Sequence, residues 1–169
     1  IIRSANLNKK KIKKIVQISS SEVYGNLMSK GKTNLLETDI LKSESPYAAS
    51  KISSDHLAIS MFKALNLPIV VARPFNTFGP RQSSRAVIPS IIVQALKNKG
   101  IKLGNLNTTR DFTYVSDIVD ALIKAAKSKI KFDVMNVGSG ETVSVNRIVK
   151  LLKGNAVKIP KRPGEPDVT

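Results

Sequence analysis

The feature that most constrains the fold is a pair of short apolar runs on either side of one long helix-forming segment. Residues 14–19 (KIVQIS) and 69–73 (IVVAR) are typical of buried strands. Between them, Ser45 can cap a helix whose first position is Pro46, and the apolar pattern continues to about Leu65. A strand, a helix and a strand at this spacing predict a βαβ unit, and therefore a parallel sheet.

Polar segments follow both predicted strands. They are residues 19–25 (SSSEVYG) and residues 74–80 (PFNTFGP), each with a glycine turn. Ligands of open parallel sheets bind beyond the carboxyl ends of the strands. We therefore expect a reaction site where these two segments meet.

The second half of the chain alternates short strands and helices. Residues 87–98 predict an amphipathic helix, and Ser116 is expected to cap the next one. The remaining predictions are strands over residues 101–104, 109–115, 132–138 and 156–160, and a helix over 143–153. This pattern predicts a smaller α/β lobe that follows the βαβ unit.

Composition excludes several classes of protein. The chain has no cysteine, which excludes disulfides and thiolate metal sites, and it has no apolar run near the roughly 18 residues that a membrane span needs. The net charge is +16, but only seven of the 28 basic residues are arginine, and aromatic residues are not interleaved with them. We therefore expect a cytoplasmic protein with neither nucleic acid nor membrane as a partner.

Five segments in order carry a resemblance to a known family. They are SSSEVYG, YAASK (47–51), RPFNTFGP (73–80), TRDFTYVSDIVDAL and NVGSGE. In this combination the chain resembles the extended short-chain dehydrogenase/reductase family, specifically the NAD-dependent epimerases and dehydratases of nucleotide sugars. The resemblance runs through essentially the whole chain. It implies an α/β fold, the C-terminal half of a Rossmann parallel sheet followed by a small α/β substrate-binding lobe.

The resemblance also implies catalytic roles. Tyr47 would take the proton of the sugar hydroxyl while hydride passes to NAD, and Ser20 would bond the reacting oxygen. A phenol is a poor base at neutral pH, but the ammonium group of Lys51, one helical turn away, would favour its ionised form. The same resemblance assigns cofactor contacts to Tyr47, Lys51, Pro74, Phe75 and Ser19.

The reaction that follows oxidation depends on the next two residues. In the dTDP-glucose dehydratases of the family, Thr-Asp-Glu stands where this chain has Ser20-Ser21-Glu22. Glu22 would remove the C5 proton, whereas Ser21 is a far weaker acid than the aspartate it replaces. We favour a 4,6-dehydratase most similar to the UDP-N-acetylglucosamine (legionaminic-type) enzymes. A UDP-sugar 4-epimerase, a UDP-glucuronate decarboxylase and a catalytically incomplete nucleotide-sugar binding fragment stay open.

Substrate contacts carry over from the family position by position. A UDP-sugar is the expected substrate, and a homodimer is the expected assembly. The expected contact residues are Asn76, Val87, Ile88, Ile101, Leu103, Arg110, Asn136 and Arg162.

One family motif has no counterpart in this sequence. The Gly-x-x-Gly-x-x-Gly turn that holds the NAD pyrophosphate is absent from the 169 residues. The expectation is a C-terminal fragment. Residues 1–80 would form part of the NAD-binding Rossmann domain, and residues 81–169 would form the substrate lobe, truncated at its end.

Overall fold

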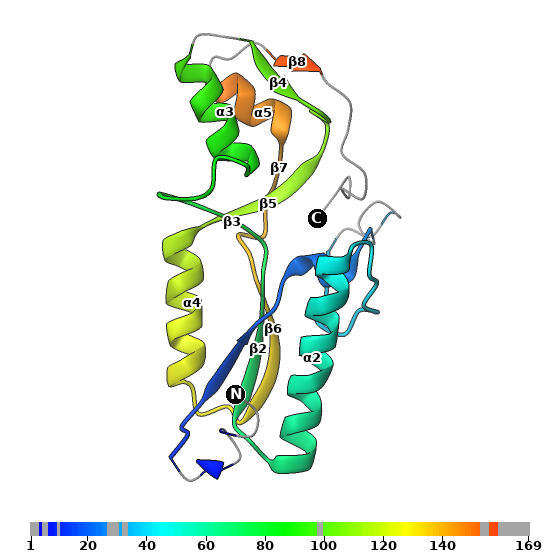
Figure 1. Cartoon of the computed structure of the whole chain (residues 1–169), viewed down its shortest axis with the longest axis vertical. Helices are drawn as coiled ribbons and strands as arrows, with labels where there is room; N and C mark the ends of the chain where they lie inside the picture. Colours follow the sequence, from blue (N-terminus) through cyan, green and yellow to red (C-terminus); the bar gives the residue numbers. More distant parts are fainter. Residues whose placement is uncertain are drawn as a thin grey trace.

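The computed structural model describes residues 4, 7–9, 11–26, 31, 34–97, 100–152 and 156–158. These residues form two lobes stacked along the longest axis of the molecule (Figure 1). The elements in chain order are β1 (Ile15–Ile18), the 3₁₀ turn η1 (Ser21–Tyr24), α2 (Pro46–Leu65), β2 (Ile69–Pro74), β3 (Asn76–Phe78), α3 (Val87–Leu96), β4 (Ile101–Leu103), β5 (Thr109–Tyr114), α4 (Val115–Lys127), β6 (Phe132–Val137), β7 (Thr142–Ser144), α5 (Val145–Leu151) and β8 (Ala156–Lys158).

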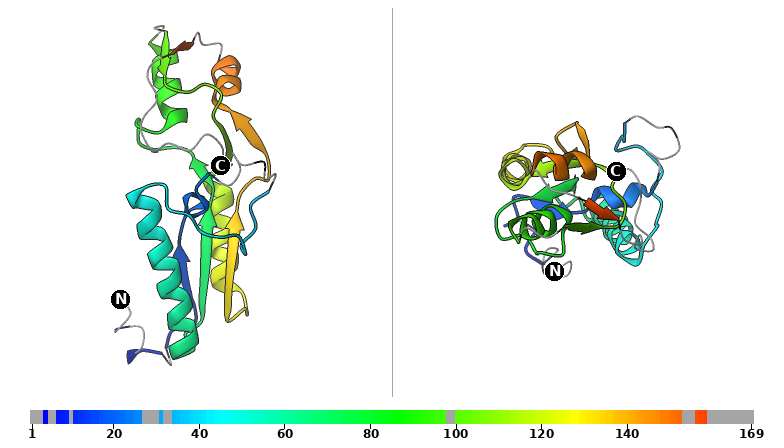
Figure 2. Two further views of the ribbon diagram at one scale, coloured as in Figure 1. Left: turned by 90° about the vertical axis from the view of Figure 1, so that its right-hand side faces the viewer. Right: turned by 90° about the horizontal axis from the view of Figure 1, so that it is seen from above.

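The lower lobe is a parallel sheet between two helices. Its strand order is β1-β2-β6, with Ile15 opposite Ile69 and Ile69 opposite Phe132. Helices α2 and α4 both contact β1 and β2, and they cover opposite faces of the sheet (Figures 1 and 2). On the α2 side, a core cluster is buried between helix and sheet: Ala58, Leu67, Ile69 and Val71. The predicted βαβ unit and the α/β fold class are confirmed.

Helix α2 begins and ends as its sequence predicts. The hydroxyl of Ser45 accepts the N–H of Ala48 at 3.1 Å, and Pro46 occupies the first helical position, where no N–H is needed. At the other end, Asn66 adopts the left-handed conformation with φ 50°, and its N–H donates to Phe62 O at 2.8 Å. The cap at Ser45 sets the start of α2 and so places Tyr47 in its first turn.

The upper lobe has its own sheets and its own core. β5 pairs with β3 in parallel and with β7 in antiparallel, and β4 pairs with β8 in parallel. Helices α3 and α5 pack on this lobe (Figure 1). Its buried cluster is made of Ile91, Ile101, Val145 and Val149. The strand β3 was not predicted, because it lies in a segment that was expected to be a polar loop. Residues 143 and 144 were expected to begin a helix, but they belong to β7, which pairs with β5, and α5 starts at Val145.

The chain returns to the lower lobe after it has entered the upper one. Helix α4 contacts β1 and β2, and all six residues of β6 pair with β2. The sheet of the lower lobe therefore draws strands from both sides of residue 80. The division of the chain at residue 80 stays a prediction as a description of domains.

The beginning of α4 differs from the sequence-based expectation. Ser116 was expected to cap this helix, but the helix starts at Val115, and Tyr114 in the N-cap position makes no side-chain capping bond. The hydroxyl of Ser116 instead donates to Oδ1 of Asp117 at 3.3 Å. The expectation was wrong because β5 runs directly into α4, which leaves no turn for a capping serine.

A buried arginine joins the elements of the lower lobe. Arg73 on β2 is 2% exposed, and its Nε lies 3.0 Å from Oδ2 of Asp55, which is 0% exposed. The Arg73 guanidinium also donates to the hydroxyl of Tyr24 at 2.7 Å and to Glu37 O at 3.1 Å. Tyr24 in turn donates to Oδ1 of Asn136 at 2.7 Å. The network connects α2, β2, η1 and β6.

Replacing Asp55 with alanine should destabilise the protein strongly, because the guanidinium of Arg73 would stay buried without its counter-charge. We expect a loss of about 3–5 kcal/mol in the free energy of unfolding, measured by urea denaturation. Asp120→Ala is the matched control, since its ion pair with Lys124 is exposed, with side chains 60% and 76% accessible. Equal losses for the two variants would contradict the role given to the buried pair.

Candidate active site

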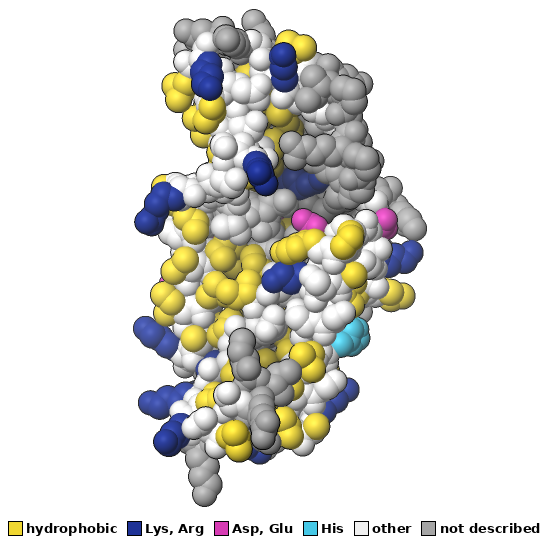
Figure 3. All heavy atoms as spheres, in the orientation of Figure 1, with side chains coloured by type: hydrophobic (Ala, Val, Ile, Leu, Met, Phe, Trp, Pro, Cys, Tyr) yellow, Lys and Arg dark blue, Asp and Glu magenta, His cyan; other side chains and the backbone are white. Residues whose placement is uncertain are grey.

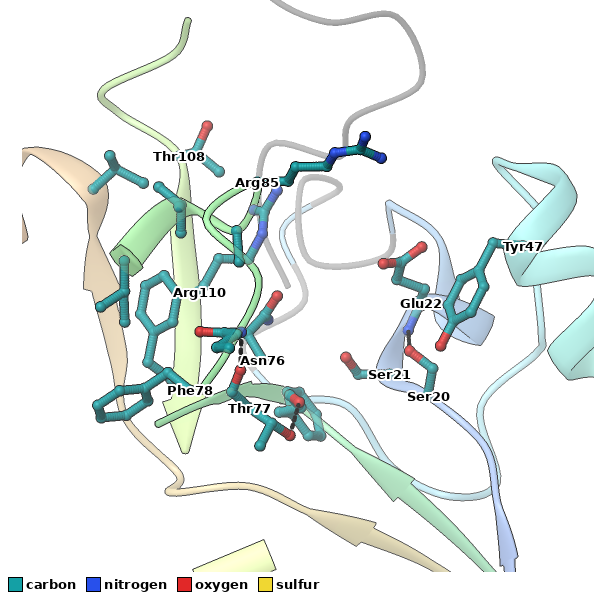
Figure 4. Close-up of a pocket in the computed structure, with 17 residues that line it drawn as sticks. Ser20, Ser21, Glu22, Tyr47, Asn76, Thr77, Phe78, Arg85, Thr108 and Arg110 are labelled. Atoms are coloured by element: carbon teal, nitrogen blue, oxygen red, sulfur yellow. Dashed lines mark hydrogen bonds between the residues drawn. The ribbon is translucent and has the colours of Figure 1, made fainter. Parts of the chain in front are cut away.

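A pocket lies between the lobes, beyond the carboxyl ends of β1 and β2 (Figure 4). Its volume is about 510 Å³. It is lined by Ser20, Ser21, Glu22, Tyr47, Phe75, Asn76, Thr77, Phe78, Gln82, Arg85, Ala86, Val87, Ile88, Thr108, Arg110, Phe112 and Val145. The two polar segments that follow the strands therefore meet, as expected for a parallel sheet.

The turn η1 presents hydroxyl and carboxyl groups to this pocket. Ser20 caps the turn, and its Oγ accepts the N–H of Glu22 at 3.2 Å. Because the hydroxyl acts as an acceptor in this bond, it keeps its own proton to donate to a bound molecule. Ser20, Ser21 and Glu22 all lie on the same wall as Tyr47 (Figure 4).

Tyr47 stands in the first turn of α2 and is 49% exposed. Its hydroxyl points toward the Ser20 side chain (Figure 4). The ammonium of Lys51 lies 5.7 Å from the centre of the Tyr47 ring and donates to Ile18 O at 3.0 Å. The last carbonyl of β1 therefore fixes a positive charge beside an accessible phenol.

The opposite wall carries basic and amide side chains. Asn76 comes from β3, Arg85 from the loop before α3, and Arg110 from β5 (Figure 4). Arg110 is 7% exposed, and its guanidinium donates to Thr109 O at 2.9 Å. Two guanidinium groups facing one pocket suit an anionic group of a ligand.

The carboxyl group of Glu22 has a perturbed acidity. Burial raises the pKa of Glu22 above its ordinary value of 4.5, and the nearby guanidinium of Arg110 partly offsets this by lowering it. A carboxylate with a raised pKa is a stronger base near neutral pH. It is the only acidic side chain on the pocket wall among the residues that the structure describes.

The structure brings together most of the expected site residues. Those that line the pocket are Ser20, Ser21, Glu22, Tyr47, Phe75, Asn76, Val87, Ile88 and Arg110. Ser19 and Pro74 do not line it but directly precede residues that do, and Lys51 lies outside the lining with its ammonium 5.7 Å from the centre of the Tyr47 ring. Their roles stay predictions.

Other expected contacts lie elsewhere. Ile101 is buried in the core of the upper lobe, and Leu103 packs against the same cluster. Asn136 is committed to internal bonds, since its amide also donates to Leu35 O at 3.0 Å. Arg162 lies outside the described residues. None of Ile101, Leu103 and Asn136 lines the pocket, and their roles as substrate contacts stay predictions.

Two residues with evident roles were missed. Arg85 lies two residues before the start of α3, in the loop after the polar segment 74–80, so a basic side chain near a site segment was a usable signal. Asp111 is 5% exposed, and its carboxylate accepts the N–H groups of Ser139 and Gly140, each at 2.9 Å. A Cβ on Gly138 would lie 2.6 Å from that carboxylate, which explains a glycine there. The sequence around Asp111 contains no local pattern that predicts its contact with residues 138–140.

Neither a cluster of metal ligands nor a membrane-spanning helix occurs among the described residues. They contain no group of three histidine, aspartate or glutamate side chains that could hold a metal ion. His56, the only histidine in the chain, is exposed on α2 away from the pocket lining. Nor does any helix of the described part combine the length and apolarity needed to cross a bilayer.

Comparison with known proteins identifies the family. The family model described as GDP-mannose 4,6 dehydratase matches residues 1–165. The dTDP-D-glucose 4,6-dehydratase of Dictyostelium discoideum is 34% identical over 144 residues, which make up 79% of this chain and 33% of that protein. The dTDP-glucose 4,6-dehydratase of Escherichia coli is 35% identical over 138 residues, which make up 77% of this chain and 38% of that protein.

Solved structures agree with this result. The UDP-glucuronic acid 4-epimerase of Bacillus cereus, solved with UDP-glucuronic acid and NAD, superposes with a TM-score of 0.90 at 30% identity. The match covers 99% of this chain and 55% of that one. The chain thus belongs to the GDP-mannose 4,6-dehydratase family of nucleotide-sugar dehydratases and epimerases. It spans between 33% and 44% of the length of the curated relatives it matches.

The residues present fit one end of the dinucleotide that this family implies. Lys51 is held beside the accessible ring of Tyr47, where a ribose hydroxyl could bond both groups. The hydroxyl of Ser19 is buried and has no hydrogen-bond partner among the described residues. These groups suit a nicotinamide ribose. A glycine-rich pyrophosphate turn does not occur in the sequence.

The raised pKa of Glu22 predicts a pH-dependent effect of Glu22→Gln on stability. Folding favours the protonated carboxyl, so the wild type is penalised above the raised pKa, and the penalty disappears below the unfolded value near 4.5. Glu22→Gln should therefore raise the melting temperature at about pH 7.5 and lose this advantage near pH 4.5. Melting curves at both pH values test this.

Glu141→Gln is the control, since it removes the same charge at an exposed position. A gain for Glu22→Gln that is no larger than that of Glu141→Gln, or one that persists unchanged in acid, would show that burial does not disfavour the Glu22 carboxylate.

Proposed function

We propose that this chain carries the catalytic residues of an NAD-dependent nucleotide-sugar 4,6-dehydratase that acts on a UDP-sugar. The observation that carries the proposal is the pocket itself. It sets Asn76, Arg85 and Arg110 on one wall, across from Tyr47 and Glu22 on the other. An anionic diphosphate at the first wall would place the attached sugar against the second.

The basic wall would bind and orient the substrate. Arg110 is buried and anchored to its own strand, so its guanidinium is pre-positioned, and Arg85 is exposed at the pocket mouth. Guanidinium groups pair with phosphate oxygens through two parallel hydrogen bonds. The aromatic rings of Phe78 and Phe112 would exclude water from the remaining surface.

Tyr47 and its neighbours would perform the oxidation at C4. When bound, NAD would supply the acceptor for the C4 hydride and the donor that returns this hydride to C6 once water has left, while C5 regains a proton, so no external oxidant is consumed. Tyr47 would take the proton from the C4 hydroxyl, and Ser20 would donate its free proton to the same oxygen. Lys51, held by Ile18 O, would stabilise negative charge on the phenol and keep its ring in place.

Glu22 would perform the elimination. A keto group at C4 makes the C5 proton removable by a carboxylate with a raised pKa. Loss of the 6-hydroxyl as water needs one proton, and no second carboxyl lines the described pocket. The proton that Glu22 takes from C5 can be delivered to the C6 oxygen, directly or through the hydroxyl of Ser21, so the step balances without another acid.

A 4-epimerase is the second candidate. It is favoured by Ser21, which replaces the acid of the dTDP-glucose enzymes, and by the similarity to the Bacillus cereus UDP-glucuronic acid 4-epimerase. An epimerase needs only the tyrosine, the lysine and the serine hydroxyl. A decarboxylase would use the same oxidation followed by loss of carbon dioxide.

Product masses distinguish these reactions. The protein, as the 169-residue chain and as expressed from its full reading frame, is incubated with NAD and UDP-N-acetylglucosamine, UDP-glucuronate or UDP-glucose. Loss of water supports the dehydratase, loss of carbon dioxide the decarboxylase, and an unchanged mass with a new retention time the epimerase. Tyr47→Phe should reduce turnover by at least about 100-fold and leave UDP-sugar binding nearly unchanged.

Tyr114→Phe is the matched control for that experiment. It also removes one phenol hydroxyl. Tyr114 does not line the pocket, although its ring packs against that of Phe78, which does. Turnover of Tyr47→Phe at the level of Tyr114→Phe would refute the role of Tyr47.

The binding of the diphosphate is tested separately from turnover. Arg85→Ala should weaken UDP binding, measured by calorimetry, by roughly tenfold, as expected for one charge-assisted contact. Arg147→Ala, which removes an exposed arginine from α5, should leave binding unchanged. Equal affinities of the two variants would place the diphosphate elsewhere.

The homodimer that the resemblance implies stays a prediction. Light scattering after size-exclusion chromatography measures the assembly directly.

A further inference from the structure

A second charged feature lies at the opposite end of the lower sheet from the pocket. Parallel strands begin at one edge, so the loops that precede β1, β2 and β6 are neighbours. Two bonds join them: the N–H of Ile15 donates to Pro68 O at 2.8 Å, and the N–H of Ile69 donates to Lys131 O at 2.9 Å. The three loops form one continuous surface.

Lysines dominate this surface, which we call the lysine face. Its exposed members are Lys11, Lys13, Lys63, Lys127, Lys129 and Lys131. Over residues 11–15, 63–69 and 127–133 the only carboxyl is that of Asp133, which accepts the N–H of Val134 at 2.8 Å. On the face shown in Figure 3, dark blue side chains surround the lower end, and the acidic ones visible there lie higher. The charge on this surface is largely uncompensated by its own neighbours.

An apolar side chain stands among these lysines. Ile130 is 45% exposed between Lys129 and Lys131. Its backbone is not free, because the ammonium of Lys14 donates to Ile130 O and approaches Ser128 Oγ at 3.5 Å. The segment after α4 therefore exposes an isoleucine side chain between two exposed lysines. Such a combination fits the boundary between lipid headgroups and acyl chains.

The same residues are poorly suited to nucleic acid. Arginine is absent from residues 11–15, 63–69 and 127–133, so bidentate phosphate contacts are not available there. The aromatic ring of Phe132 is stacked on Phe62, with ring centres 4.5 Å apart, and is not free to stack on bases. Diffuse attraction by lysines together with an exposed aliphatic side chain favours a lipid surface.

We propose that the lysine face docks on an anionic lipid bilayer, with Ile130 inserted at the level of the headgroups. This replaces the sequence-based expectation of no membrane partner, which rested on the lack of a spanning segment. Each lysine near such a surface strengthens binding by roughly fivefold. Since the pocket opens between the lobes at the far end of the sheet, the docked protein would keep its site open to solution (Figure 1).

The test is sedimentation of the protein with lipid vesicles. Vesicles with about 30 mol% phosphatidylglycerol in phosphatidylcholine are compared with pure phosphatidylcholine at about 0.1 M salt. We expect binding to the anionic vesicles only. A triple variant should weaken this binding on the order of 100-fold, at roughly fivefold per lysine: Lys127→Gln, Lys129→Gln and Lys131→Gln.

A matched triple variant separates a docking surface from net charge. It removes the same charge from exposed lysines of the upper lobe: Lys97→Gln, Lys102→Gln and Lys150→Gln. This variant should bind within about twofold of the wild type. Ile130→Ser should weaken binding about fivefold without any change of charge. Circular dichroism and melting temperature confirm that each variant is folded.

Three outcomes would overturn the proposal. One is equal binding to neutral and anionic vesicles. Another is an equal loss of binding in the two triple variants. The third is tighter binding to a single-stranded oligonucleotide than to vesicles at the same salt concentration, with no effect of Ile130→Ser on either binding. This outcome would make nucleic acid the partner.

Discussion

The buried ion pair between Arg73 and Asp55 is the contact on which the geometry of the site depends. It fixes α2 against β2, and the same guanidinium holds the hydroxyl of Tyr24 at the end of η1. Tyr47 lies on α2, about two helical turns before Asp55, and Glu22 lies on η1, close to Tyr24. Leaving a guanidinium unpaired in the interior costs several kcal/mol, so alternative placements of α2 are disfavoured. The buried pair therefore also restricts the positions of Tyr47 and Glu22.

The two ends of the parallel sheet carry different kinds of side chain. The carboxyl ends of the strands carry the pocket, where hydroxyl, phenol, carboxyl and guanidinium groups converge from both lobes. The amino ends carry lysines. Each lobe packs its own apolar cluster, and α4 and β6 return the chain to the lower sheet. Ligand binding can therefore use the space between the lobes without disturbing either core.

Local signals explain which predictions succeeded. The signals at Ser45 and Asn66 predicted the first and last residues of α2 correctly. The pocket lies where it was predicted, beyond the carboxyl ends of β1 and β2. Contacts between distant segments gave no local signal. Ile101 packs in the core of the upper lobe, and Asn136 accepts a hydrogen bond from the hydroxyl of Tyr24, 112 residues away; their roles at the substrate stay predictions. Ser116 lost its capping role to the direct junction of β5 and α4.

The amino-acid sequence alone determined the βαβ unit, the helix that bears Tyr47 and Lys51, and the order of the polar segments, because caps, periodicity and strand ends act over a few residues. Only the tertiary structure decided which side chains meet. It paired Arg73 with Asp55, set Arg85 and Arg110 opposite Glu22, and raised the pKa of that carboxyl. Burial and Coulomb interactions depend on distances in space, and sequence separation does not specify those distances.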